Sequence, residues 1–149
     1  MIDNYDKLPS FILFIHPTRF QWHNDDPDYD GFQVLRRVQL PYVKQRGYVN
    51  LRCVWVLGCL SEIKPLEDAD KLRESNAGYY AGYHFKAAFE ELFPGTPVPE
   101  TVGSSCCAQF AVTRAKILER PTSDYERYRE WILQTRLNDD MSGRIMEYS

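Results

Sequence analysis

The sequence lacks several features that define whole classes of proteins. No segment comes near the roughly 20 consecutive apolar residues of a membrane-spanning helix, and residues 1–6 lack the basic and apolar regions of a signal peptide. Internal repeats, low-complexity segments and a Gly-rich phosphate loop are also missing. The sequence therefore predicts a soluble cytoplasmic protein with no membrane partner.

Positive charge and regularly spaced cysteines are scarce too. Lys and Arg number 18 against 21 Asp and Glu, which gives a net charge of -3 and no general attraction to DNA. None of the four cysteines sits in a CxxC pair, so structural thiols are expected, with a zinc site or a catalytic thiol as alternatives. Vicinal Cys106 and Cys107 cannot easily bond to each other without distorting the peptide between them.

The chain does have enough hydrophobic residues to form a buried core. The chain has 149 residues, of which 44% are hydrophobic and 14% aromatic, and this predicts a single α/β domain over residues 1–149. Three apolar runs separated by helical patterns read as buried strands: Ser10–Ile15, Arg52–Leu57 and Cys106–Val112. We expect them in one mixed, mostly parallel sheet with helices on both faces.

Pro, Gly and capping residues indicate where the helices begin and end. The expected helical segments are Ile2–Lys7, a helix capped within residues 28–30, Pro41–Lys44, Tyr79–Phe93, Arg114–Arg120, Asp124–Thr135 and an amphipathic start at residues 139–148. The charged segment Glu62–Asn76 is expected to be a surface loop.

Most residues able to do chemistry follow the first apolar run, where ligands sit in open α/β sheets. They are His16, Arg19, Trp22, His23, Asn24, Asp25 and Asp26. The two carboxylates can hold a divalent ion or act as a general base, or they can serve as a turn and helix cap. His16 and His23 can relay protons, or pack against Trp22.

Two arginines are candidates for holding a phosphate or a carboxylate. Arg19 and Arg144 have the guanidinium geometry for such bidentate bonds, or for structural ion pairs with Glu147 or Asp140. We expect His16, Arg19, His23, Asp26, Gln109 and Arg144 to converge on one cleft. No resident cofactor is predicted, apart from the divalent ion that the two carboxylates can hold.

Several motifs in order along the chain resemble a fungal family of unknown function. They are His16-x-x-Arg19, residues 21–26, residues 47–53, residues 106–112, Arg120-Pro121 and Ser142-Gly143-Arg144-x-x-Glu147-Tyr148. The segment around Gln109 is similar to the closing strand and helix of glycosyltransferase-A-like proteins. The family also includes synthases of arginine-containing cyclic dipeptides, which draw aminoacyl groups from tRNA.

The resemblance implies group transfer from an activated small-molecule or aminoacyl-tRNA donor. For a cyclodipeptide synthase, Asp25, Asp26 or Glu147 would recognise a guanidinium or take a proton, His23 would act as acid or base, and Cys107 or Ser105 would accept an acyl group. The substrate would also contact His16, Arg19, Trp22, Asn24, Cys107, Gln109 and Arg144. A nucleotide-sugar-dependent glycosyltransferase and an inactive fragment are the alternatives.

Two departures from the family pattern matter. Pro17-Thr18 stands where members carry Gly-His, which removes a backbone N–H beside the site. Members also have an opening strand before Ile2 and a Trp-His continuation after Tyr148, so we expect an incomplete glycosyltransferase-A-like domain.

Overall fold

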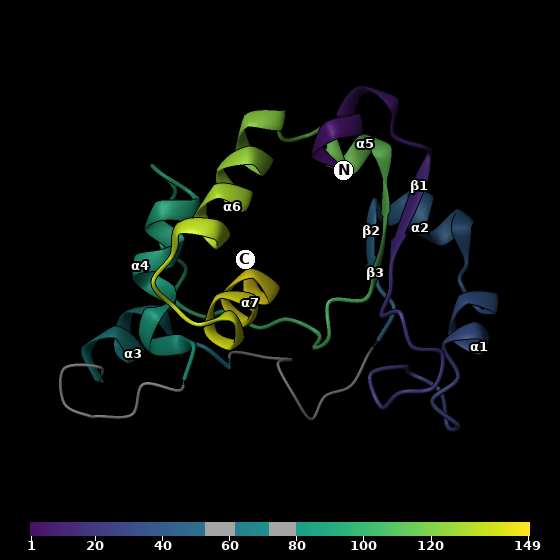
Figure 1. Cartoon of the computed structure of the whole chain (residues 1–149), viewed down its shortest axis with the longest axis horizontal. Helices are drawn as coiled ribbons and strands as arrows, with labels where there is room; N and C mark the ends of the chain where they lie inside the picture. Colours follow the sequence, from purple (N-terminus) through teal and green to yellow (C-terminus); the bar gives the residue numbers. More distant parts are fainter. Residues whose placement is uncertain (53–61, 72–79) are drawn as a thin grey trace. The chain divides into compact units, whose positions relative to one another are not determined.

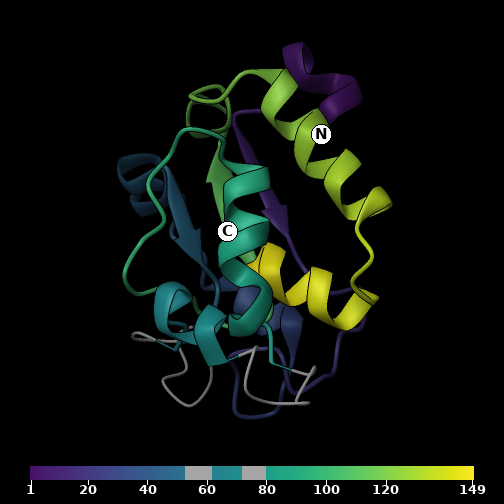
Figure 2. The same cartoon turned by 90° about the vertical axis from the view of Figure 1, so that its left-hand side faces the viewer.

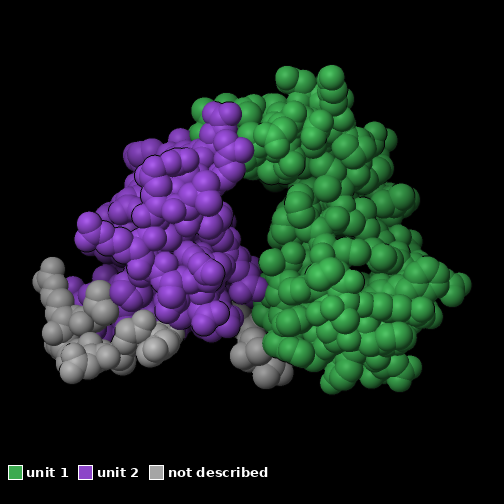
Figure 3. All heavy atoms as spheres, viewed as in Figure 1, with its two compact units in different colours: residues 1–57, 105–125 green, residues 58–104, 126–149 purple. Residues whose placement is uncertain are grey.

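The computed structural model describes residues 1–52, 62–71 and 80–149 of the chain (Figure 1). These residues belong to two compact units, which Figure 3 colours separately. Unit 1 comprises residues 1–57 and 105–125, and unit 2 comprises residues 58–104 and 126–149. That the two units fold as one domain stays a prediction.

Unit 1 is built on a small antiparallel sheet. Its strands are β1 (Phe11–Phe14), β2 (Tyr48–Asn50) and β3 (Phe110–Thr113), in the order β1-β3-β2. Both neighbours of β3 run antiparallel to it, with Leu13 and Val49 each opposite Ala111. The mostly parallel sheet predicted from the apolar runs is therefore wrong.

The boundaries of two predicted strands also change. The third apolar run becomes a strand only from Phe110, because Cys106–Gln109 lie in the turn before it. Arg52 lies outside any strand, and the rest of the run Arg52–Leu57 falls outside the described residues. The second strand of the sheet is instead the short segment Tyr48–Asn50, which carries no long apolar run.

Short helices surround this sheet at positions that the sequence marks. They are the 3-10 helix η1 (Ile2–Lys7), α1 (Gly31–Arg36), α2 (Leu40–Arg46) and α5 (Arg114–Ile117). Asp30 caps α1 by accepting a hydrogen bond from the Phe32 N–H, and Gly47 ends α2 with a φ of 78°, a conformation that glycine adopts freely. Leu8, Val112 and Ile117 form the buried core of the unit.

Helices are the main elements among the described residues of unit 2, which also hold an isolated β-bridge between Ile63 and Val102. Its helices are α3 (Pro65–Lys71), α4 (Gly82–Leu92), α7 (Asp139–Tyr148) and most of α6 (Thr122–Gln134), which begins in unit 1. Phe85, Leu92 and Ile145 are fully buried between α4 and α7, which lie beside each other in Figure 2. Tyr128 and Trp131 of α6 pack against this cluster.

The helix α3 corrects the prediction of a surface loop at Glu62–Asn76 over residues 65–71, while residues 72–76 lie outside the described residues. Its first turn carries acidic residues, which suit a helix N-terminus, and buried Asp68 accepts a hydrogen bond from the Lys64 N–H at 2.9 Å. The hydroxyl of Tyr80 donates to the Glu62 carbonyl oxygen at 2.6 Å. Burial and the nearby Asp68 charge raise the pKa of Tyr80 to about 12. Tertiary contacts thus stabilise a segment whose charged composition indicates a loop.

Candidate functional site

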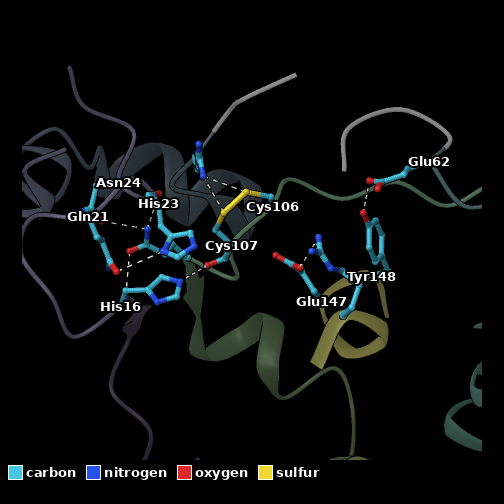
Figure 4. Close-up of a disulfide and its surroundings, with 12 residues drawn as sticks. His16, Gln21, His23, Asn24, Glu62, Cys106, Cys107, Glu147 and Tyr148 are labelled. Atoms are coloured by element: carbon cyan, nitrogen blue, oxygen red, sulfur yellow. Dashed lines mark hydrogen bonds and ion pairs between the residues drawn. A yellow bond between two sulfur atoms is a disulfide. The ribbon is translucent and has the colours of Figure 1, made fainter. Parts of the chain in front are cut away.

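The side chain of Gln109 forms hydrogen bonds with three residues of unit 1, His16, His23 and Asn24. Gln109 precedes β3 and is 6% exposed. Its Oε1 accepts a hydrogen bond from the His16 N–H at 3.2 Å, and its Nε2 donates to the His23 carbonyl oxygen at 2.9 Å and to Asn24 Oδ1 at 3.3 Å (Figure 4). The predicted proximity of His16, His23 and Gln109 is therefore confirmed.

The loop after β1 is closed by buried polar side chains. Asn24 Nδ2 donates to the carbonyl oxygens of Arg19 and Tyr29, at 2.7 and 2.8 Å. Asp26 accepts hydrogen bonds from the backbone N–H groups of Asp28 and Asp30. These contacts help an irregular loop to hold one shape, since the buried side chains of Asn24 and Asp26 both have hydrogen-bond partners.

Both buried carboxylates of this loop already hold arginines of the chain. Asp26 pairs with Arg37 at 2.9 Å, and Asp30 forms two hydrogen bonds of 2.8 Å with Arg19. For Asp26 the geometry favours the structural alternative, a turn. Arg19 also forms a structural ion pair, but with Asp30 and not with the predicted partners Glu147 or Asp140. Asp25 is exposed.

The Arg19–Asp30 pair predicts a pH dependence. The hydrogen bond from Arg19 holds the pKa of Asp30 below its usual value, which is about 3.9 in peptides. A carboxyl with a lowered pKa in the folded state adds stability above its unfolded pKa and loses it as the pH falls through its folded pKa. We expect Asp30→Asn, which keeps a good helix cap, to lower the urea midpoint near neutral pH. This difference should shrink as the pH falls below about 3.9 and through the lowered pKa of Asp30. Exposed Asp28→Asn is the control, and equal effects of the two changes would contradict this role.

A stack of planar side chains lies beside the loop. The imidazole rings of His16 and His23 are parallel within 9°, with centroids 4.4 Å apart, and the Trp22 ring lies 4.0 Å from that of His23. The guanidinium of Arg52 lies 5.0 Å from the Trp22 ring centroid. The N–H groups of stacked imidazoles point outward in their own planes, so His16 and His23 cannot pass a proton directly to each other in this arrangement.

The hydrogen bond of His16 identifies its basic nitrogen. Nε2 lies 3.0 Å from the carbonyl oxygen of Cys107. A carbonyl oxygen only accepts, so Nε2 carries the proton in this bond and the neutral ring has its lone pair at Nδ1. Nδ1 is thus the atom of His16 that can take a proton from a ligand.

A pocket of about 210 Å³ adjoins His16. Its walls include Phe32, Val34 and Leu35 from α1, together with His16, Arg19 and Gln109. Among the described residues that line the pocket, none is a carboxylate. The pocket thus offers the imidazole of His16, the guanidinium of Arg19, the amides of Asn24 and Gln109, and an apolar wall.

The vicinal cysteines form a disulfide, Cys106–Cys107, which corrects the prediction of free thiols (Figure 4). The backbone accommodates it with positive φ at Cys107 (86°) and at Ala108 (46°). Arg52 Nη1 donates to both sulfur atoms, at 3.1 Å to Cys106 and 2.8 Å to Cys107. In this form, Cys107 has no thiolate and cannot accept an acyl group.

The remaining candidates belong to unit 2. Arg144 and Glu147 both lie on α7, where their charged atoms approach to 3.8 Å, so the structural ion pair predicted as an alternative is present. Tyr148, next in sequence, donates its hydroxyl hydrogen to Glu62. That Arg144 and Glu147 join the residues of unit 1 in one cleft stays a prediction.

Sequence reasoning missed Arg52 and Arg37 as parts of the site. Arg52 directly precedes an apolar run, and Arg37 follows α1. The motif of residues 47–53 includes Arg52 but does not indicate its role, because its partner Cys106 lies 54 residues further along the chain.

Two features are absent from the described part of the chain, a metal-binding cluster and a membrane-spanning helix. No cluster of three or more His, Cys, Asp or Glu side chains is placed to hold a metal ion. None of the helices in the described segments is both long and apolar enough to cross a membrane.

Comparison with known proteins identifies the family. No curated protein and no solved structure matches the chain. The family model described as "Protein of unknown function (DUF3431)" matches residues 1–149, the whole of the sequence. The chain therefore belongs to the DUF3431 family.

Proposed function

We propose that this chain carries a group-transfer site for a donor that contains a nucleotide. The observation that carries the proposal is a cluster of exposed aromatic rings and guanidinium groups next to the pocket. Phe20, Trp22 and Phe32 are 59%, 50% and 52% exposed. Arg19 lies 4.8 and 5.6 Å from the ring centroids of Phe20 and Phe32. Aromatic rings interleaved with arginines suit the stacking of bases and the binding of phosphates.

The proposed donor is an aminoacyl-tRNA, and the proposed product is an arginine-containing cyclic dipeptide. In this reaction, the α-amine of one aminoacyl group attacks the ester carbonyl of the other. A peptide bond forms, and the ester bond to the 3′ oxygen of the tRNA breaks. A second attack of the same kind closes the ring. Enzymes accelerate such steps by placing a base at the amine.

His16 is the residue of this chain best placed to move the proton. It lines the pocket, and its Nδ1 is the acceptor nitrogen. We assign to it the removal of a proton from the attacking amine and the return of that proton to the leaving 3′ oxygen. The imidazole of His23 stacks face to face on that of His16, so its proposed role is to fix the orientation of His16.

The guanidinium of an arginyl substrate needs a carboxylate. Asp26 and Asp30 are buried, whereas Asp25 is exposed to solvent on the same loop. We therefore assign recognition of the arginyl group to Asp25.

The test is a product assay with purified protein. With a mixture of aminoacyl-tRNAs that includes arginyl-tRNA, we expect a mass that corresponds to an arginine-containing diketopiperazine, and we expect less of it for Asp25→Asn. Nucleotide sugars should release no nucleotide. Nucleotide release without a cyclic dipeptide would support a glycosyltransferase instead, and no product from either donor would support an inactive fragment; both results contradict the proposal.

Donor binding offers a separate prediction. Removal of the Phe32 ring should weaken binding of a labelled RNA minihelix that ends in CCA, because stacking on an aromatic side chain is worth about 1–3 kcal/mol per base, or roughly 5- to 150-fold in Kd. The control is Tyr42→Ala, which removes a ring of similar exposure, 51%, from α2. Equal Kd values for Phe32→Ala, Tyr42→Ala and the unchanged protein, measured by fluorescence anisotropy, would exclude Phe32 from the binding surface.

A further inference from the structure

The buried guanidinium of Arg52 has unusual partners. Arg52 is 9% exposed, and within the described residues its hydrogen-bond acceptors are the two sulfur atoms of the Cys106–Cys107 disulfide. Its Nε has no hydrogen-bond partner in that part of the chain. A disulfide sulfur is a weak acceptor and carries no charge, whereas buried cations are normally paired with anions. The surroundings of Arg52 thus suit a thiolate better than a disulfide.

The two sulfur atoms differ in accessibility. Cys106 is buried, and Cys107 is half-buried. An incoming thiolate therefore reaches the Cys107 sulfur more easily, which leaves the Cys106 sulfur to depart. Arg52 Nη1 lies 3.1 Å from that departing sulfur. A nearby cation favours the thiolate and makes it a better leaving group.

We propose that Cys106 and Cys107 form a redox site that is reduced by low-molecular-weight thiols, with Arg52 stabilising the departing thiolate. The thiolate of one small thiol attacks the Cys107 sulfur, a mixed disulfide forms, and the Cys106–Cys107 bond breaks, with its electron pair going to Cys106. A second small thiolate attacks the outer sulfur of the mixed disulfide. The small thiol leaves as its own disulfide, and Cys106 and Cys107 are left as a dithiol that takes up two protons from water.

The redox site is connected to the imidazole pair through one peptide. The carbonyl oxygen of Cys107 accepts the hydrogen bond from His16 Nε2, and Cys107 has a φ of 86° while it is held in the disulfide. Residues other than glycine seldom adopt this conformation. Once the disulfide is reduced, Cys107 is free to leave it, so the His16 ring should change its environment. The inference does not rest on the proposed reaction, because its test reads the sulfur atoms themselves.

The experiment follows the thiols by mass spectrometry on the folded, air-oxidised full chain. Trypsin releases residues 87–114 as one peptide that contains Cys106 and Cys107 and no other cysteine. The protein is exposed to glutathione or dithiothreitol for increasing times, acidified, alkylated with iodoacetamide in denaturant and digested. We expect no carbamidomethyl group on this peptide before reduction and two afterwards. Two groups without any added thiol, or reduction only after the protein is unfolded, would overturn the proposal.

Variants of Arg52 test its assigned role. We expect reduction of Arg52→Gln to be slower by roughly 3- to 10-fold, because loss of the cation raises the thiol pKa of the leaving group. Arg52→Lys keeps the charge and should stay close to the unchanged protein. Arg46→Gln removes an exposed charge from α2 and is the matched control. Equal rates for folded Arg52→Gln and Arg46→Gln would overturn the role of Arg52, and the experiment on the unchanged chain decides the redox site without any variant.

Discussion

Replacement of Gln109 by leucine is expected to lower the free energy of unfolding by roughly 2 to 6 kcal/mol. The amide of Gln109 is buried and makes hydrogen bonds to the His16 N–H, the His23 carbonyl oxygen and Asn24 Oδ1. Leucine fills a similar volume but leaves these groups without that partner, at about 1–3 kcal/mol for the buried Asn24 Oδ1 and about 0.5–1.5 kcal/mol for each of the two half-buried backbone groups. Urea denaturation followed by circular dichroism measures the loss.

The matched control is Gln39→Leu. Gln39 is exposed, and its amide donates a single hydrogen bond of 3.2 Å to the Arg37 carbonyl oxygen. Water replaces that bond after substitution, so the change should cost less than about 1 kcal/mol. If the two leucine variants unfold at the same urea concentration, the stabilising role that we assign to the hydrogen bonds of Gln109 is wrong.

Apart from α3, the helices of the described residues could be predicted from the sequence because their ends carry local signals. Asp30 before α1 and Gly47 after α2 act through contacts with their own helix, which a short stretch of sequence encodes. Strand direction has no such signal. The apolar run that contains β1 reads the same whether its neighbour is parallel or antiparallel, and pairing with β3 joins residues about a hundred positions apart. The orientation of the sheet therefore had to come from the structure.

The candidate site could be predicted in part, because some of its residues lie close together in the sequence. The loop after β1 concentrates polar residues within eleven positions, which located the site, and Gln109 emerged from a motif. The sequence did not indicate which side chains are free to act. Asp26 is occupied by Arg37, and Cys107 by Cys106 and Arg52, and both outcomes depend on tertiary contacts.

Substitution of His16 by glutamine should reduce the proposed transfer reaction by roughly 10²- to 10⁴-fold, the usual contribution of a positioned general base. The glutamine amide can still donate a hydrogen bond to the Cys107 carbonyl oxygen, which His16 Nε2 contacts in the unchanged chain. It has no nitrogen that takes up a proton near neutral pH. The variant should therefore fold, bind the donor and fail in the chemical step.

The control for this change is His84→Gln. His84 lies in α4 of unit 2 and is not among the residues that line the pocket, and its substitution removes one imidazole from the same chain. Its rate of product formation should equal that of the unchanged protein. Thermal melting of both variants establishes that each is folded before the rates are compared.

The most direct test of the account is a single-turnover measurement with arginyl-tRNA and a second aminoacyl-tRNA at saturating concentrations. Saturation separates the chemical step from donor binding. The account predicts that His16→Gln binds the minihelix with a Kd within about 3-fold of that of His84→Gln, a difference below 1 kcal/mol, yet forms the peptide bond at least about 100-fold more slowly. Equal rates for the two variants would contradict the claim that His16 carries the proton at this site.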